Sequence, residues 1–217
     1  MSQLLYQEQH RLPPVLPGYS HINRYWDRTM DLPAAKLLPG EFYVSLHGEM
    51  IVTVLGSCIS ACIRDKVLGI GGMNHFMLPV KGDLNRSWGS DPASSETRYG
   101  NWAMEFLINE ILKNGGLRKN LEVKIFGGGK VMANMGDVGK RNIEFVLDYI
   151  KSEGLSIAAQ DVGDIYPRKV LYFPDTGAVK VRKMRTLHND TLVRREMAYS
   201  DQLRTPESKD GDIELFD

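Results

Sequence analysis

A cysteine and a histidine with the chemistry for acyl transfer lie on either side of a short polar segment. Cys58 follows an apolar run that ends in Gly56-Ser57, and His75 stands in Gly-Gly-Met-Asn-His-Phe at 71–76. If residues 65–68 form the loop of a β-hairpin, Cys58 falls directly opposite His75. Opposed residues of antiparallel strands share one face, with Cβ atoms about 4.5 to 5.5 Å apart. The spacing therefore predicts a thiol–imidazole pair.

The backbone before Cys58 contributes to the same chemistry. Gly56-Ser57 at the end of a buried strand permits a sharp turn that aims amide groups at a reacting oxygen. A neighbouring imidazolium lowers the pKa of a thiol from about 8.5, because it favours the thiolate. We therefore predict that Cys58 is a nucleophile, and we interpret Cys62, which lacks such a setting, as core packing.

Thr53 lies on the strand that leads into this turn. Its hydroxyl could orient the imidazole through a hydrogen bond to the second ring nitrogen. A backbone carbonyl could do the same, and threonine is also an ordinary strand former. Both interpretations of Thr53 stay open at the level of sequence.

No pattern in the chain indicates a bound metal ion or cofactor. The run Gly127-Gly128-Gly129-Lys130 lacks the hydroxyl residue of a phosphate loop, since Val131 occupies that position. The two cysteines and His75 do not have the usual spacing of zinc ligands. We interpret the glycine run as a tight strand-to-loop turn, and we expect neither a metal nor a cofactor.

The elements that must position these residues alternate between strand and helix patterns. The predicted hairpin has strands at 59–64 and 68–78, and apolar residues at helical spacing predict helices at 97–113 and 137–152. Further strands are expected at 41–45, 50–55, 121–126, 155–161, 169–173 and 178–183. Residues 80–96 form a polar loop after the histidine strand, and 82–95 either contact substrate or only connect elements.

The 217 residues divide by composition into three segments. Residues 1–40 are rich in proline and are expected to form an arm with little regular structure. Residues 41–183 form the compact domain, and 184–217 form a polar, acidic tail. Lysine plus arginine and aspartate plus glutamate both total 27, which argues against a generic nucleic-acid surface. Neither a membrane span nor a secretory signal is visible, so we expect a cytoplasmic protein.

Several short motifs occur together in a specific order. They stand at 53–58, 74–79, 124–128, 139–143, 161–163 with Arg168, and 176–177. This ordered set resembles the CheD family, the chemoreceptor glutamine deamidases of bacterial chemotaxis. Asp164 stands where the family often has a second glycine after Asp-Val-Gly. The resemblance implies a layered α/β/α sandwich: a single α/β domain with a mixed sheet and a β-hairpin that carries Cys58 and His75.

The resemblance also implies roles for individual residues. Cys58 is the nucleophile, His75 the base and Thr53 the third member of the triad, while Gly56 and Ser57 shape the oxyanion turn. Asn74 and Phe76, which flank His75, are expected to contact the substrate. The implied reaction is that of a protein-glutamine glutaminase, which hydrolyses glutamine side chains on chemoreceptors to glutamate through a Cys–His thioester.

The implied partners are the cytoplasmic helical bundle of a chemoreceptor and a CheC-type chemotaxis phosphatase, without nucleic acid and without insertion into a membrane. One alternative is a non-catalytic adaptor that docks on receptors or on the phosphatase. Another is a different thiol hydrolase, such as a peptidase or a transglutaminase-like enzyme.

Overall fold

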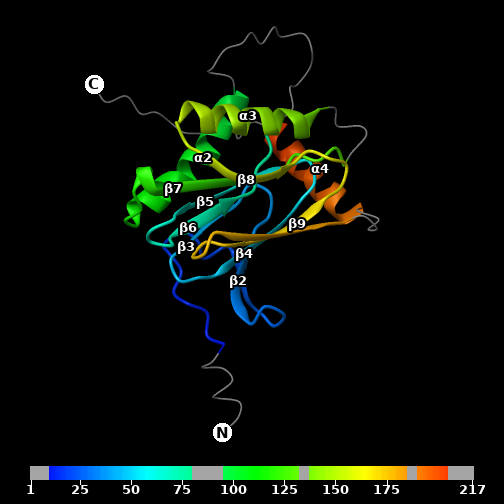
Figure 1. Ribbon diagram of the computed structural model, residues 1–217. Helices are drawn as coiled ribbons and strands as arrows, with labels where there is room; N and C mark the ends of the chain where they lie inside the picture. Colours follow the sequence, from blue (N-terminus) through cyan, green and yellow to red (C-terminus); the bar gives the residue numbers. More distant parts are fainter. Residues whose placement is uncertain (1–9, 80–94, 132–136, 185–189, 205–217) are drawn as a thin grey trace, which may run out of the picture.

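Two five-stranded sheets and two long helices form three stacked layers in the computed structural model, which describes residues 10–79, 95–131, 137–184 and 190–204 (Figure 1). The first sheet has the strand order β1-β2-β4-β9-β10, and the second has the order β3-β6-β5-β7-β8. The helices cover the outer face of the second sheet (Figure 1). None of the helices in the described part of the chain is long and apolar enough to cross a membrane.

The first sheet is mixed. Its strands are β1 (Asn23–Asp27), β2 (Leu32–Lys36), β4 (Met50–Leu55), β9 (Arg168–Phe173) and β10 (Ala178–Lys183). Strand β2 pairs in parallel with β4, and the other neighbours are antiparallel. Thr53 of β4 lies opposite Val170 of β9 near the centre of this sheet.

The second sheet is also mixed. Its strands are β3 (Phe42–Ser45), β5 (Ile59–Asp65), β6 (Gly71–Asn74), β7 (Leu121–Gly127) and β8 (Ile157–Val162). Strands β7 and β8 are parallel, and the remaining pairs are antiparallel. The hairpin β5–β6 occupies its middle, so Cys58 and His75 adjoin buried strands.

Three α-helices are described. Helices α2 (Ser95–Lys113) and α3 (Val138–Ser152) lie on the second sheet, and a short 3-10 turn, Arg118–Asn120, precedes β7. The third, α4 (Asp190–Arg204), lies beside the two sheets (Figure 1), next to the turn that follows β4.

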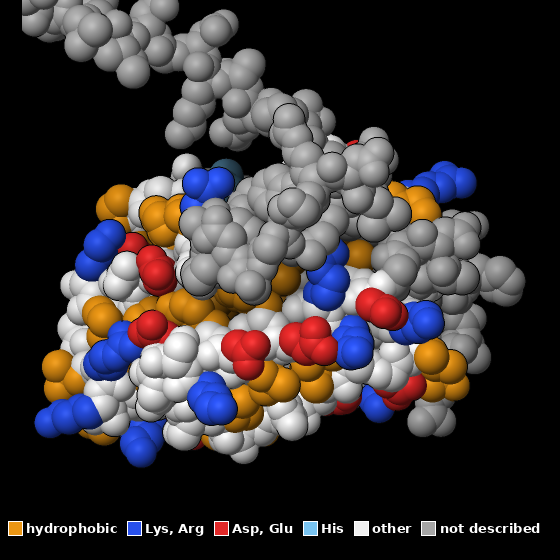
Figure 2. Space-filling view, turned by 90° about the horizontal axis from the view of Figure 1, so that it is seen from above, with side chains coloured by type: hydrophobic (Ala, Val, Ile, Leu, Met, Phe, Trp, Pro, Cys, Tyr) orange, Lys and Arg blue, Asp and Glu red, His pale blue; other side chains and the backbone are white. Residues whose placement is uncertain are grey.

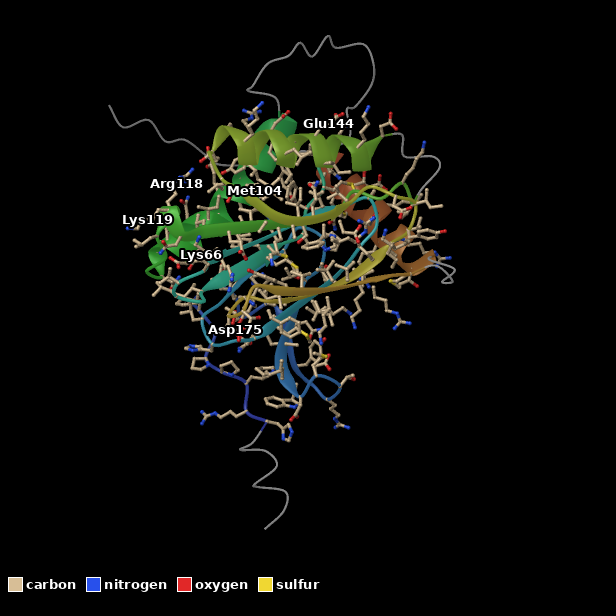
Figure 3. The ribbon with its side chains drawn as sticks, viewed as in Figure 1. Lys66, Met104, Arg118, Lys119, Glu144 and Asp175 are labelled. Atoms are coloured by element: carbon tan, nitrogen blue, oxygen red, sulfur yellow. The ribbon has the colours of Figure 1, made fainter. Side chains whose placement is uncertain are left out.

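Alternating side chains of β5 divide the core into two parts. Ile59, Ala61 and Ile63 pack with α2 and α3, whereas Cys58 and Cys62 belong to the cluster between the two sheets. This is the period of two that a strand buried on both faces requires. The turns also tie the sheets together, since Arg64 Nη1 donates to the carbonyl of Asp175 at 3.0 Å (Asp175 is labelled in Figure 3).

The expected single α/β domain with a hairpin carrying the reactive pair is confirmed. One point of the layering differs from the expected α/β/α sandwich, because the strands divide into two mixed sheets stacked on each other. The reason is that β4 and β9 pair with each other, not with β5, and so belong to the first sheet with β2 and β10. The extents of the arm, domain and tail stay predictions.

The expectation that residues 1–40 have little regular structure is wrong for Asn23–Asp27 and Leu32–Lys36, which form β1 and β2. Pro33 is tolerated because it lies near the start of β2, before the register with β4 begins at Ala34. The helix α4 within the expected tail was likewise not predicted.

The predicted hairpin register is also wrong, by two residues. Cys62 pairs with Met73 and Ile59 with Phe76, so His75 lies opposite Ser60 and not opposite Cys58. The loop begins one residue later than expected because the Asp65 carboxylate accepts the amides of Val67 and Leu68. A slip of two residues keeps every side chain on its face of the sheet. The reactive pair therefore stays on a common face.

Candidate active site

Cys58 lies immediately before β5, at the end of the turn that leaves β4, and none of its surface is exposed. Its sulfur, a ring nitrogen of His75 and a carboxylate oxygen of Glu196 all lie within 4.8 Å of one another. Three distant segments of the chain thus bring a thiol, an imidazole and a carboxylate to one buried point. The thiol and the imidazole are close enough for a proton to pass between them after a small adjustment.

Thr53 of the first sheet holds the imidazole of His75. The Thr53 hydroxyl donates to the carbonyl of Leu37 at 3.0 Å, and its oxygen lies 2.7 Å from His75 Nδ1. Because the only hydroxyl proton is used on Leu37, Thr53 Oγ1 must accept from Nδ1–H. The proton on Nδ1 leaves a lone pair on Nε2, which is buried and has no hydrogen-bond partner among the described residues. In this tautomer Nε2 is the ring nitrogen that can accept a proton.

Three successive backbone amides of the Gly56-Ser57-Cys58 turn converge on one point. They do so because each carbonyl of the turn is held on the other side: Gly129 N donates to Gly56, Asn142 Nδ2 to Ser57 and Gly128 N to Cys58, at 2.7 to 2.8 Å. Successive amides of this kind form an anion-binding concavity. The turn has the donors that a developing oxyanion needs.

The glycine run 127–129 makes this arrangement possible. Gly127 has a φ of 110°, and a Cβ there would lie 2.3 Å from the carbonyl oxygen of Cys58. Only glycine allows β7 to approach the turn so closely. The interpretation of this run as a tight strand-to-loop turn agrees with the geometry. Asp164, the position where the family often has glycine, has a φ of 68°.

A carboxylate occupies the concavity. Glu196 of α4 accepts hydrogen bonds from Gly56 N at 2.8 Å, from Ser57 N at 2.9 Å and from Ser57 Oγ at 2.6 Å, with Cys58 N at 3.4 Å. Thiolate, imidazole and carboxylate are also the ligand types of zinc. Both oxygens of Glu196 already accept from N–H and O–H donors, which leaves the carboxylate poorly placed to bind a metal ion as well.

Burial and neighbouring charges set the protonation of the pair. Burial raises the pKa of the Cys58 thiol well above its usual value, and the negative charge of Glu196 raises it further. Burial lowers the pKa of His75 to about 3, and Arg195 adds to this shift. Both directions disfavour the thiolate–imidazolium form. The described conformation holds the pair as a neutral thiol and a neutral imidazole.

The other residues singled out in the sequence lie close by in different settings. Asn74 Oδ1 accepts from Ala61 N at 2.7 Å, and its Nδ2 donates to the carbonyl of Ala103 and to Met104 Sδ on α2 (labelled in Figure 3). Phe76 packs in the core beneath the helices. Substrate contact by these two residues stays a prediction. Of the proposed contact loop, residues 82–94 lie outside the described part of the chain.

Glu196 is the site residue that sequence reasoning missed. Apolar residues at helical spacing, Leu192, Tyr199 and Leu203, were the available signal for its helix. No local pattern marks a glutamate of a polar helix as buried, because its donors lie some 140 positions away in the sequence.

A pocket of about 470 Å³ adjoins the turn on the side where α3 begins. Ser57 lines it together with the glycine run and the first turns of α3, including Glu144 (labelled in Figure 3). Cys58 does not line it. The sulfur is thus enclosed even though an open pocket lies beside its turn.

Comparison with known proteins places the chain among relatives of one family. A family model described as CheD chemotactic sensory transduction matches residues 77–183. A protein of Halorhodospira halophila named "Probable chemoreceptor glutamine deamidase CheD" is 56% identical over 205 residues, covering 94% of each chain. Proteins with the same name from Saccharophagus degradans and Herminiimonas arsenicoxydans are 52% and 54% identical, over 95% and 89% of this chain and 95% and 94% of their own.

Proposed function

The chain belongs to the CheD family, and from that premise we propose that it hydrolyses glutamine side chains of chemoreceptors to glutamate, with Cys58 as the nucleophile. The observation that carries the proposal is the convergence of the Cys58 sulfur, the His75 imidazole and three backbone amides on one point. The names of the relatives supply the class of substrate. The geometry supports the proposed chemistry, because the thiol, the imidazole and the amide donors lie close together.

In the first half of the reaction, His75 Nε2 takes the thiol proton and the Cys58 sulfur attacks the carboxamide carbon. The amides of the Gly56-Ser57-Cys58 turn then stabilise the oxyanion. The tetrahedral intermediate breaks its C–N bond, and the His75 imidazolium protonates the departing nitrogen. Ammonia leaves and a thioester remains on Cys58.

In the second half, His75 takes a proton from a water molecule that attacks the thioester carbon. The C–S bond breaks, and the sulfur recovers its proton from the imidazolium. Glutamine and water have become glutamate and ammonia, and the enzyme is unchanged. In both halves Thr53 keeps the Nδ1 proton in place, so that Nε2 is the nitrogen that exchanges protons.

The test uses the two cysteines as a matched pair. Both are buried between the sheets, but Cys62 lies within β5 and Cys58 belongs to the amide turn before it. A chemoreceptor cytoplasmic fragment is incubated with the wild type, Cys58→Ala or Cys62→Ala, and converted glutamines are mapped by mass spectrometry. We expect Cys58→Ala to abolish conversion and Cys62→Ala to retain it.

Residual conversion by Cys58→Ala equal to that of the wild type would overturn the assignment of the nucleophile. A fragment that binds every variant yet is never converted would instead favour the adaptor. Cleaved or cross-linked fragments would indicate a different thiol hydrolase.

A further inference from the structure

Helix α4 buries one face against the end of the two sheets. Leu192, Glu196, Tyr199 and Ser200 are the buried residues of this face. Glu196 is fully enclosed, and a buried carboxylate is costly unless its oxygens are well satisfied. The placement of a charged side chain at the centre of a docking face therefore requires an explanation.

The explanation lies in the donors that it meets. Glu196 is bound by the amides of Gly56, Ser57 and Cys58, which are the groups assigned above to the oxyanion. A Cβ at position 56 would lie 2.8 Å from both of its oxygens, so the glycine leaves space for this carboxylate. The Glu196 carboxylate thus occupies the position that we assign to the carboxamide of the substrate.

The chemistry of the occupant matches the proposed product. A glutamate side chain projecting from a helix is what deamidation of a helical glutamine leaves behind. We propose that α4 is an intramolecular product mimic: Glu196 occupies the carboxamide subsite, and α4 must leave before a receptor helix can enter. This inference rests on the proposed function and adds to it the way in which a helix presents its side chain.

Charged residues of α4 add to the effect of burial on the pKa values of Cys58 and His75. Glu196 raises the pKa of the Cys58 thiol, and Arg195 lowers the pKa of His75, each in addition to the effect of burial. Both residues belong to the occupying helix. Departure of α4 removes both charges and opens the sulfur to solvent, so the nucleophile becomes accessible and easier to ionise in one step.

A contact separate from Glu196 also holds α4. The Tyr199 hydroxyl hydrogen-bonds with that of Tyr99 on α2, and the Tyr199 ring lies against Gly40. The opposite face of α4 is exposed, with Met197 40% accessible. A second helix carrying glutamine could replace these contacts with its own.

The kinetic test compares full-length variants on the receptor fragment. Glu196→Ala removes the occupying carboxylate, and Tyr199→Ala weakens the docking of α4 through a separate contact. The control is Asp201→Asn, an exposed acid of the same helix. If the closed form competes with substrate, we expect both test variants to lower KM by about tenfold or more with kcat nearly unchanged, because KM scales inversely with the open fraction.

Unchanged KM in both test variants, with an active wild type, would overturn the inference and leave the proposed function intact. Conversion by none of the variants would overturn the proposed function itself. The control separates a loss of occupancy from a mere loss of negative charge, since a lowered KM in Asp201→Asn as well would contradict the role of Glu196.

A second measurement examines the subsite directly. In Glu196→Gln the chain carries a carboxamide where we place the substrate. Mass spectrometry of the purified protein should find position 196 converted to glutamate, and the double variant with Cys58→Ala should keep the amide. Persistence of the introduced amide in a chain that converts the receptor fragment would contradict the placement of position 196.

Discussion

At the scale of single residues, the site depends on where one proton sits on His75. Thr53 uses its own proton on Leu37, so it can only accept from the imidazole. This fixes the tautomer with Nε2 unprotonated, which is the form that a general base requires. On the proposed mechanism, Thr53 is a positioning residue that acts on the reaction through His75.

Replacement of the hydroxyl tests this role. In Thr53→Val the Nδ1–H loses a buried acceptor, a change of about 1 to 3 kcal/mol, and we expect kcat to fall by about 10- to 100-fold. Thr53→Ser keeps the hydroxyl and should recover most of the activity. Equal losses in both variants, measured by the rate of ammonia release, would show that the methyl group matters more than the hydroxyl.

The buried imidazole also predicts how stability depends on pH. Burial lowers the pKa of His75 in the folded state to about 3, with Arg195 adding to the shift, whereas an unfolded histidine titrates near 6.5. Between these values the unfolded state binds more protons, so the free energy of unfolding falls as pH falls through this window, by up to about 1.4 kcal/mol per pH unit.

Urea denaturation across this window, with His75→Gln as the reference, measures the effect. We expect the difference between the wild type and the variant to shrink as the pH falls below about 6.5, where unfolded histidine begins to bind a proton. Parallel pH profiles for the two proteins would contradict it.

At the scale of elements, strong periodic patterns predicted most of the fold. Strands Met50–Leu55 and Ala178–Lys183 begin and end where their apolar patterns and turns place them. The hairpin register was missed because it depends on the side chain of Asp65, whose hydrogen bonds set where the turn starts. The pairing of β4 with β9 could not be predicted from local sequence patterns either, because it joins segments more than a hundred residues apart.

For the site, the sequence predicted that residues of two short motifs, 53–58 and 74–79, lie close together. Cys58, His75 and Thr53 do meet in one place, and the predicted hydrogen bond between Thr53 and His75 is present. The convergence of three amides depends on partners from β7 and α3, including Asn142, that no local pattern indicates. Glu196 was missed for the same reason, because only the tertiary fold brings α4 to the turn.

One buried arginine joins elements of the two sheets and offers a prediction at this scale. Arg168 on β9 donates to the carboxylate of Asp161 at 2.8 Å, and to the backbone carbonyls of Asp161 and Gly163 at the end of β8. We expect Arg168→Met to lower the free energy of unfolding by about 3 kcal/mol or more, because it leaves these acceptors without their charged donor.

Urea denaturation measures the loss, with Arg182→Met on the exposed side of β10 as the control. A surface substitution of that kind should change stability by no more than about 0.5 kcal/mol. Similar values for the two variants would show that Arg168 does not connect the sheets energetically.

At the scale of the whole molecule, charge is balanced and spread out. The chain carries equal numbers of acidic and basic residues, and Figure 2 shows both signs mixed over the face seen from above, with apolar side chains between them. No single-signed field dominates this face. We therefore expect recognition of a receptor to depend on shape and on the buried subsite more than on long-range attraction.

The short connection between β10 and α4 has a consequence for selectivity. Only residues 184–189 separate the end of the sheet from the helix that carries Glu196. A group tethered over such a distance acts at a local concentration of about millimolar. On the proposed occupation of the subsite by Glu196, a helix from solution competes with this tethered side chain, and we expect conversion only of glutamines presented at a comparable local concentration. The length of the connection between β10 and α4 would then set the local concentration of glutamine that a substrate must exceed.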